Sequence, residues 1–211
     1  MSSSPKIVVV TNGKGGVGKT TTAMGLSAIF SQKYKVLAVD ADSQGSLSWW
    51  ASRGEMPFDL AKETDPKLLG RLRKIEGYDL VVVDTPPALR SEALAAVVAI
   101  ADYLVLPTPC APMDLAVLIE TVREAVTPVG TPHRVLLTKV DSRSLGEALE
   151  AQNTLMELGI PACHAFIRAY KAHERAALDG VPVTHMRGKN AREAEADYRR
   201  VADELQRDWR Q

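Results

Sequence analysis

The sequence is poor in cysteine, in aromatic residues and in charge of one sign. Among 211 residues there are two cysteines, Cys110 and Cys163, and 5% of the residues are aromatic. Two isolated cysteines without an export signal indicate reduced thiols, and scarce aromatics make an array of base-stacking side chains unexpected. Lysine and arginine total 26, as do aspartate and glutamate, so the formal net charge is zero. The totals therefore exclude a strongly basic chain and leave only a local basic patch open.

Long hydrophobic runs are also missing. The longest, Ala93 to Ala101, has nine residues, about half of what a membrane span needs. The early run Ile7 to Val10 is too short for the apolar core of a signal peptide. We therefore expect a cytoplasmic protein that does not bind membranes. With 45% hydrophobic and 25% charged residues, the composition is that of a globular chain, and residues 1–211 are expected to form a single domain.

What the sequence does contain is an alternation of short β-branched runs with helical stretches. Strands are expected at Ile7–Thr11, Val36–Asp40, Leu80–Asp84, Tyr103–Leu106 and Val135–Thr138, with a weaker candidate at Cys163–Ile167. Helical patterns follow the first strand and cover residues 46–52, 91–101, 113–126, 145–158 and 191–208. Because the strong strands are continuous apolar runs, both faces of the sheet must be covered. The pattern predicts an α/β fold, with a doubly wound and mostly parallel sheet and helices on both faces.

A glycine-rich loop lies between the first expected strand and the first helix. It reads Gly13-Lys14-Gly15-Gly16-Val17-Gly18-Lys19-Thr20 and satisfies the phosphate-loop pattern G-x-x-x-x-G-K-[ST]. Glycines allow successive N–H groups to curl around phosphate oxygens, and the start of the helix adds its positive dipole end. Lys19 is expected to reach the β- and γ-phosphates, and the Thr20 hydroxyl to ligate Mg²⁺. The predicted nucleotide-binding residues are Gly13, Lys14, Gly15, Gly16, Val17, Gly18, Lys19, Thr20 and Thr21.

Two of the expected strands end in carboxylates. Asp40 ends the second strand and Asp84 ends the third. In a parallel sheet the carboxyl ends of the strands meet at the edge where ligands bind, so both side chains are expected near the phosphate loop.

At these residues the sequence resembles the ParA/MinD family of deviant Walker A ATPases. Residues 14–20 match the family hallmark K-G-G-x-G-K-[ST]. Residues 39–45 resemble the D-x-D-P-Q-G stretch, with Ser43 where proline is usual, and residues 80–87 look like Walker B followed by the D-T-P-P switch. The resemblance implies a P-loop NTPase that uses ATP and Mg²⁺. It also implies that Thr20, Asp40 and Asp84 are the Mg²⁺ residues, with each aspartate acting through a bound water.

The resemblance also implies roles for individual residues. Two subunits would face each other across two ATP molecules, with Lys14 reaching the partner's nucleotide as an arginine finger does. Asp42 would orient or activate the attacking water, so Lys14, Lys19 and Asp42 are the expected catalytic residues. From the residues alone, Lys14 could be a solvated loop lysine and Asp42 a cap of the helix near Ser46.

A second motif points to a different nucleotide. Thr138-Lys139-Val140-Asp141 follows a strand and fits [NT]-K-x-D, the pattern by which many GTPases bind guanine. Asp141 could accept two hydrogen bonds from that base. The ParA family often carries loosely similar polar stretches here and still uses ATP, so we predict ATP and keep GTP as the alternative.

Basic residues gather in the last quarter of the chain. Small partition ATPases of this kind bind DNA without sequence preference once they dimerise, which implies DNA contacts by Arg168, Lys171, Arg175, Arg187, Lys189 and Arg192. Residues 164–211 hold ten Lys/Arg and eight Asp/Glu. The excess is only two, so a solvated face is the alternative.

The expected C-terminal helix carries a narrow apolar stripe, formed by Tyr198, Val201, Leu205 and Trp209. It is expected to pack on the protein rather than on lipid, because its flanks mix both charges and a membrane-targeting helix would be more basic. Of the adjacent Trp49 and Trp50, at least one is expected in the core and the other could be exposed.

Together these features predict a small ParA-type switch. An ATP-bound homodimer would associate with nonspecific DNA and thus with the nucleoid. A ParB-type adaptor linked to a plasmid, a chromosome or another large assembly would stimulate its slow hydrolysis. Two alternatives stay open: a MinD-like regulator at the membrane surface, and a P-loop enzyme that uses ATP or GTP on a small substrate.

Overall fold

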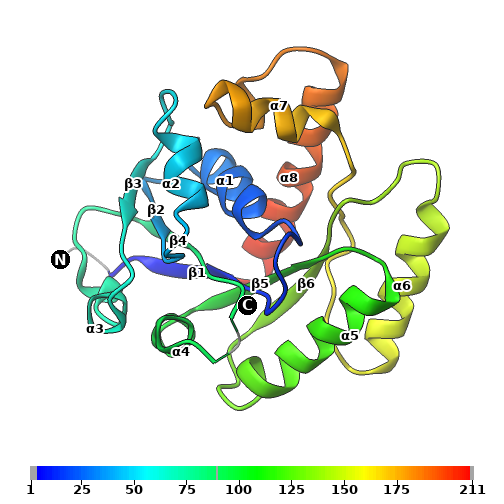
Figure 1. Ribbon diagram of the computed structural model, residues 1–211, viewed down its shortest axis with the longest axis horizontal. Helices are drawn as coiled ribbons and strands as arrows, with labels where there is room; N and C mark the ends of the chain where they lie inside the picture. Colours follow the sequence, from blue (N-terminus) through cyan, green and yellow to red (C-terminus); the bar gives the residue numbers. More distant parts are fainter. Residues whose placement is uncertain (1–3, 89, 210–211) are drawn as a thin grey trace.

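The computed structural model describes residues 4–88 and 90–209 (Figure 1). Its strands form one sheet in the order β3-β2-β4-β1-β5-β6, and each neighbouring pair is parallel. The strands are β1 (Lys6–Val10), β2 (Val36–Asp40), β3 (Asp59–Lys62), β4 (Leu80–Asp84), β5 (Tyr103–Thr108) and β6 (His133–Leu137).

Helices cover both faces of this sheet. They are α1 (Lys19–Phe30), α2 (Ser46–Ala51), α3 (Pro66–Leu69), α4 (Glu92–Val98), α5 (Pro112–Thr121), α6 (Leu145–Glu157), α7 (Lys171–Asp179) and α8 (Lys189–Asp208). Short turns of helix occupy Leu72–Lys74, Val122–Val126 and Val183–His185. Figure 1 shows α1, α2, α7 and α8 on one side of the sheet and α3, α4 and α5 on the other. The predicted doubly wound α/β fold is confirmed.

The central strand β1 shows why the sequence runs are continuously apolar. Val8 and Val10 face the core formed with α1 and α8, whereas Ile7 and Val9 face the core formed with α4 and α5. All four side chains are fully buried. A strand with helices on both faces needs apolar residues at every position, so it lacks the alternation of a half-exposed strand.

Helix α8 packs closely on α1, as its apolar stripe predicted. Tyr198, Val201 and Leu205 are buried. A Cβ added at Gly25 would lie 2.7 Å from the ring of Tyr198, so this contact depends on the missing side chain. The ring of Trp209 lies 5.2 Å from that of Phe30. The stripe is therefore enclosed by the molecule itself.

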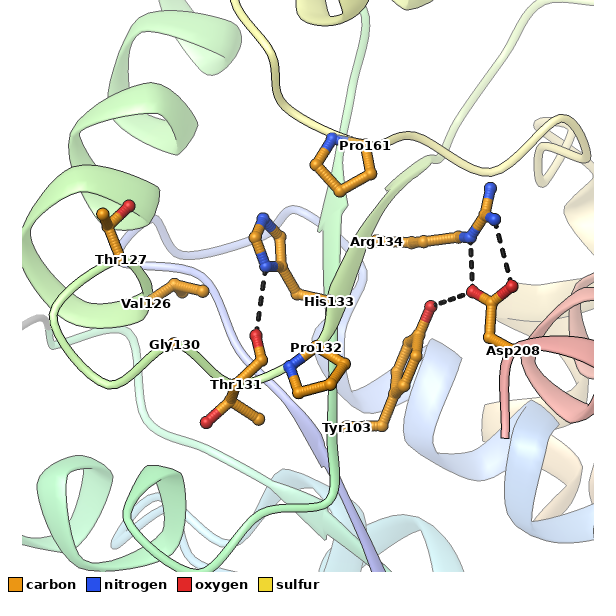
Figure 2. Close-up of a pocket in the computed structure, with 10 residues that line it drawn as sticks. All are labelled: Tyr103, Val126, Thr127, Gly130, Thr131, Pro132, His133, Arg134, Pro161 and Asp208. Carbon is orange, nitrogen blue, oxygen red and sulfur yellow. Dashed lines mark hydrogen bonds and ion pairs between the residues drawn. The ribbon is translucent and has the colours of Figure 1, made fainter. Parts of the chain in front are cut away.

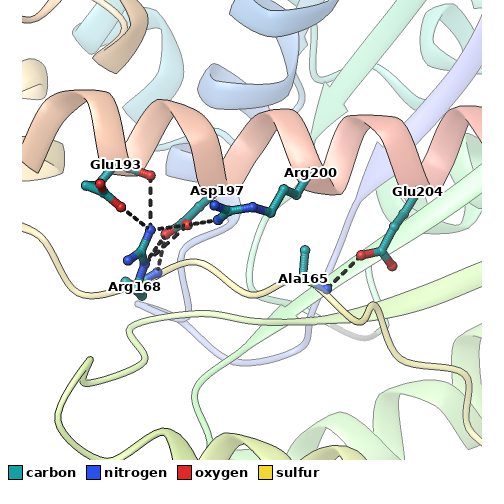
Figure 3. Close-up of polar contacts among 6 residues, drawn as sticks. All are labelled: Ala165, Arg168, Glu193, Asp197, Arg200 and Glu204. Carbon is teal, nitrogen blue, oxygen red and sulfur yellow. Dashed lines mark hydrogen bonds and ion pairs between the residues drawn. The ribbon is translucent and has the colours of Figure 1, made fainter.

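The structure differs from the predicted strands in two places. β3 was not predicted, because this edge strand reads Asp-Leu-Ala-Lys and has no apolar run. The weaker candidate at Cys163–Ile167 is not a strand, and the structure has only isolated bridges around it. Cys163 and Ile167 donate backbone hydrogen bonds to β6, but between them the N–H groups of His164 and Ala165 donate to the Glu204 carboxylate of α8 (Figure 3).

Other expectations hold in the described part of the chain. Cys110 and Cys163 are free thiols. Trp50 is buried, whereas Trp49 is half-exposed and lies under the guanidinium of Arg53. None of the described helices is long and apolar enough to cross a membrane.

Candidate functional site

The phosphate loop lies at the carboxyl edge of the sheet, between the end of β1 and the start of α1. β1 has β4 on one side and β5 on the other, so the loop sits where the chain passes from one half of the sheet to the other. Ligands of open α/β sheets bind at such a switch point. The two carboxylates that end β2 and β4, Asp40 and Asp84, are paired in register beside it.

The loop is held from its first residue by Asn12, which the sequence analysis missed. Asn12 is fully buried, accepts a hydrogen bond from the backbone N–H of Lys14 at 3.0 Å and donates one to the carbonyl of Pro107 at 2.9 Å. Farther along, Gly16 and Gly18 have φ of +74° and +99°, conformations that favour glycine. The signal for Asn12 is a polar residue between an apolar strand and a glycine-rich loop.

A cavity of about 780 Å³ opens beside the loop. The loop and the start of α1 line it, together with Asp42 and residues 167–171. Its lining includes Gly15, Gly16, Gly18, Lys19, Thr20 and Thr21 of the predicted nucleotide-binding residues. The volume is within the range of cofactor and substrate pockets.

Lys19 lies mostly inside the protein at this cavity. Its Nζ donates a hydrogen bond to the carbonyl of Lys14 at 2.9 Å. Burial lowers the pKa of Lys19, and the carboxylates of Asp84 and Asp42 oppose that shift. Its ammonium is thus positioned among backbone groups of the loop, where phosphate oxygens can replace the carbonyl as its acceptor.

The oxygen atoms around Thr20 fit a divalent cation. The Thr20 hydroxyl donates to Oδ2 of Asp84 at 2.7 Å, while Oδ1 of Asp84 is buried without a hydrogen-bond partner. Burial raises the pKa of Asp84 to about 7, and nearby Asp40 and Asp42 add to that shift. The described residues contain no cluster of three or more His, Cys, Asp or Glu that could hold a metal. A hydroxyl and few carboxylates, completed by water and phosphate, suit Mg²⁺.

Asp40 ends β2 and Asp42 lies in the loop that follows, and their contacts differ. Asp40 is fully buried, and its two oxygens accept hydrogen bonds from the backbone N–H groups of Asp42 at 3.2 Å and Ser48 at 2.8 Å. Asp40, rather than Asp42, therefore binds the start of α2. Asp42 accepts a hydrogen bond from the backbone of Gln44 and lines the cavity.

Lys14 lies at the entrance of the loop and is not among the described residues that line the cavity. Its Nζ is 2.8 Å from Oδ1 of Asp114, in the first turn of α5. The side chain of Lys14 is 39% exposed. It is thus an ion-paired surface lysine rather than a freely solvated one.

The T-K-x-D motif is divided between two environments. Thr138 and Lys139 contact the phosphate loop with their side chains and line the cavity. Asp141 is exposed, and the backbone and guanidinium of Arg143 hold the pKa of its carboxyl at about 2. Asp141 is not among the described residues that line the cavity, so the guanine-binding arrangement is not formed.

The expected DNA-binding residues differ in how free their charges are. Arg168 forms ion pairs with Asp197 and Glu193 of α8 (Figure 3). Its charge is neutralised within the chain, so the structure argues against Arg168 as a DNA contact. The others are exposed and form no ion pair with any described residue: Lys171, Arg175, Arg187, Lys189 and Arg192.

A second cavity, of about 540 Å³, lies at the opposite edge of the sheet, where β5 and β6 begin (Figure 2). Several of its polar groups are paired within the chain, whereas Nε2 of His133 is buried without a hydrogen-bond partner. Arg134 and Tyr103 both donate to the carboxylate of Asp208, which joins the end of α8 to the sheet. It is far from the phosphate loop and serves the attachment of α8.

The fold and the site together define a P-loop nucleotide-binding protein. Residues 8–183 match the family described as the CobQ/CobB/MinD/ParA nucleotide binding domain. The chain belongs to this family, which confirms the predicted relationship to ParA and MinD and the expected cofactors ATP and Mg²⁺.

Two relatives carry the name maintenance of carboxysome distribution protein A. The protein from Gloeobacter kilaueensis is 71% identical over 99% of this chain and 98% of its own length. The protein from Halothiobacillus neapolitanus is 28% identical over 94% of this chain and 95% of its own length.

Solved structures bear out the fold. An ATP complex of a Cyanothece McdA protein has a TM-score of 0.76 and 19% identity, covering 96% of this chain and 97% of the other. The MinD cell division protein of Aquifex aeolicus has a TM-score of 0.78 and 17% identity, covering 95% of this chain and 97% of the other.

Proposed function

We propose that this protein is an ATP-dependent, dimerising ATPase switch that maintains the distribution of carboxysomes. The dimer binds nonspecific DNA, and a ParB-type adaptor on the cargo stimulates slow ATP hydrolysis. The choice of cargo rests on the Gloeobacter kilaueensis relative, which is named for carboxysome distribution and matches nearly the whole chain. For chromosomes, another cargo with a named relative, the partitioning ATPase Soj of Thermus thermophilus is 31% identical over 69% of this chain.

The position of Lys14 is the observation that carries the dimer. Its backbone carbonyl is held by Lys19, so the two lysines belong to one loop, yet its side chain leads to the surface and ends at Asp114. A lysine that acted on the nucleotide of its own chain would be expected in the cavity. Its place outside the cavity supports our proposal that Lys14 acts on the nucleotide of a facing copy, once it leaves Asp114.

The other predicted site residues have different roles in hydrolysis, all within one chain. Lys19 neutralises charge on the phosphates, and Asp42 orients or activates the attacking water. Thr20 and Asp84 would hold Mg²⁺, which supplies charge stabilisation at the phosphates. Asp40 would hold a water bound to Mg²⁺, and its carboxylate also accepts a hydrogen bond from the backbone of Asp42.

We assign DNA binding to exposed basic side chains on α7 and at the start of α8. Lys171 and Arg175 belong to α7, and Lys189 and Arg192 to the first turn of α8, with Arg187 just before it. Figure 1 shows α7 and the beginning of α8 next to each other on the same side of the sheet. We call these five exposed cations the basic surface of one subunit. A dimer would present two such surfaces to DNA phosphates.

The structure gives less support to the alternatives. A MinD-like membrane helix would need a free apolar face, whereas the stripe of α8 is buried on α1. A GTP-using enzyme would need Asp141 at the base, whereas Asp141 is bound to Arg143.

The proposal is tested by size-exclusion chromatography of Asp42→Ala with ATP and Mg²⁺. We expect a dimer that co-elutes with plasmid DNA, because binding is kept while hydrolysis is blocked. Adding Lys14→Ala should abolish both the dimer and the DNA complex. A chain that stays monomeric at high concentration, or a dimer indifferent to Lys14→Ala, would contradict the switch. Flotation with anionic vesicles in ATP would instead support the membrane alternative.

A further inference from the structure

Two neighbouring residues after β6, both of which also line the cavity, bind the backbone of the phosphate loop. The Thr138 hydroxyl donates a hydrogen bond to the carbonyl of Val17 at 2.7 Å. The Lys139 ammonium donates one to the carbonyl of Gly16 at 2.6 Å. Successive residues of the motif thus bind successive carbonyls of the loop, more than a hundred positions away in sequence.

The backbone at Lys139 is strained. Its φ is +54°, and no other non-glycine residue in the described ranges has a positive φ. Glycine adopts this conformation without the steric cost that a Cβ adds. The residue under strain is also the one whose ammonium reaches the loop, and strain retained at such a contact is typical of functional sites.

Thr138 is fixed by its surroundings as well. It is buried, its backbone N–H donates to the carbonyl of Thr108, and its side chain lies 3.6 Å from where a Cβ on Gly18 would be. The hydroxyl therefore has little freedom and is aimed at Val17. Together the two hydrogen bonds, at Val17 and Gly16, hold the part of the loop that leads into α1.

These contacts have a direct consequence for phosphate binding. A loop that cradles phosphate must turn its N–H groups inward, so its carbonyls must point outward and find other donors. Thr138 and Lys139 supply two such donors at Val17 and Gly16. Without them the carbonyls could rotate toward the anion, which costs binding energy.

We propose that Thr138 and Lys139 are positioning residues for ATP, which hold the phosphate loop in its binding shape. The motif Thr138-Lys139-Val140-Asp141 then serves the phosphates through its first half and does not bind the base through Asp141. The proposal rests on nucleotide binding by the family and does not depend on the dimer switch.

The test measures the affinity of the monomeric protein for a fluorescent N-methylanthraniloyl ATP analogue with Mg²⁺, and its melting temperature without nucleotide. Thr138→Val keeps the shape of the side chain but removes the donor, and should weaken binding about tenfold. Thr138→Ser keeps a hydroxyl and should stay within about twofold of the parent protein. If the parent protein, Thr138→Val and Thr138→Ser bind the analogue with equal affinity, the positioning role of Thr138 is overturned.

Lys139→Gly separates positioning from mere stability. It removes the ammonium and relieves the strained φ, so binding should weaken about tenfold while the melting temperature stays equal or rises. A purely structural residue would change both quantities in the same direction. Unchanged affinity in Lys139→Gly would overturn its role.

Asp141→Asn is the matched control within the motif. We expect the affinities for ATP and GTP analogues to stay as in the parent protein. A change in the preference between the two bases would show that Asp141 binds the base and would overturn the proposal. If the parent protein binds ATP but never dimerises, the switch fails and this proposal stands on its own measurements.

Discussion

Lys14 and Lys19 lie five residues apart on one loop, yet the structure gives them opposite surroundings. Lys19 is buried at the cavity, where burial lowers its pKa, whereas Lys14 is at the surface in an ion pair with Asp114. Both match the family motif equally well in sequence. Only the structure shows that the side chain of Lys14 has a partner within its own chain.

Asp114 therefore competes with any partner subunit for Lys14. Asp114→Asn should free the lysine, and the ATP-dependent dimer should form at a protein concentration a few times lower, because an exposed ion pair contributes up to about 1 kcal/mol. Analytical ultracentrifugation with ATP and Mg²⁺ in the Asp42→Ala background measures this.

Lys14→Ala together with Asp114→Asn is the control for this prediction. The double variant should not dimerise, since Asp114 acts only through the lysine. If Asp114→Asn alone loses the dimer, Asp114 supports Lys14 in the assembled state and the competition does not exist.

At the scale of elements, α8 is joined to the nucleotide site through residues 167–169. Val140, next to the Lys139 contact, exchanges backbone hydrogen bonds with Ile167 and Ala169. Between them, Arg168 is bound by the buried carboxylate of Asp197, which also accepts a hydrogen bond from Arg200 (Figure 3). A wall of the cavity thus takes its position from a helix far from it in sequence.

Asp197→Asn should weaken this connection. The substitution removes the charge that faces Arg168 and Arg200 in a buried place, so the free energy of unfolding should fall by about 2 kcal/mol. ATP affinity should fall too, because residues 167–171 line the cavity. Urea unfolding and titration with a fluorescent ATP analogue measure the two effects.

The exposed pair between Arg199 and Glu195 on the same helix provides the comparison. Glu195→Gln should change the free energy of unfolding by less than about 0.5 kcal/mol and leave ATP affinity unaltered. If Asp197→Asn behaves like Glu195→Gln, then α8 is held by its apolar stripe alone.

Whether a strand could be predicted from the sequence depended on how its backbone and side chains are surrounded in the fold. Buried strands such as β1 and β4 are recognisable because helices on both faces require apolar residues throughout. The edge strand β3 has no such requirement, and the segment at Cys163–Ile167 looked like a strand although a side chain, Glu204, satisfies its backbone. Local composition does not reveal a hydrogen-bond partner that lies 40 residues away.

The same limit applies to the site. The phosphate loop, Asp42 and Asp84 could be located by motif, because the chemistry fixes their spacing. Asn12 and Asp114 belong to no pattern and act through the folded chain. Lys139 was noticed for a motif whose apparent meaning, a guanine contact, differs from the contact that the structure shows.

At the scale of the whole molecule, a zero net charge has to be reconciled with the proposed DNA binding. The basic surface at Lys171, Arg175, Arg187, Lys189 and Arg192 is local, and a single copy offers few phosphate contacts. Two copies on one DNA add their contacts, so affinity should rise steeply on dimerisation. The ATP switch would thus control DNA binding through the number of cations presented together.

This makes the salt dependence of DNA binding diagnostic. In the ATP-bound Asp42→Ala dimer, Lys189→Ala removes one cation from each subunit, so the slope of log affinity against log salt should become shallower by about two. Fluorescence anisotropy with a labelled duplex at several salt concentrations measures the slope. Lys33→Ala, which removes an exposed cation just after α1, should leave it unchanged. Equal slopes for Lys189→Ala and Lys33→Ala would place the DNA elsewhere, because only cations that lie against phosphates release counterions when the complex forms.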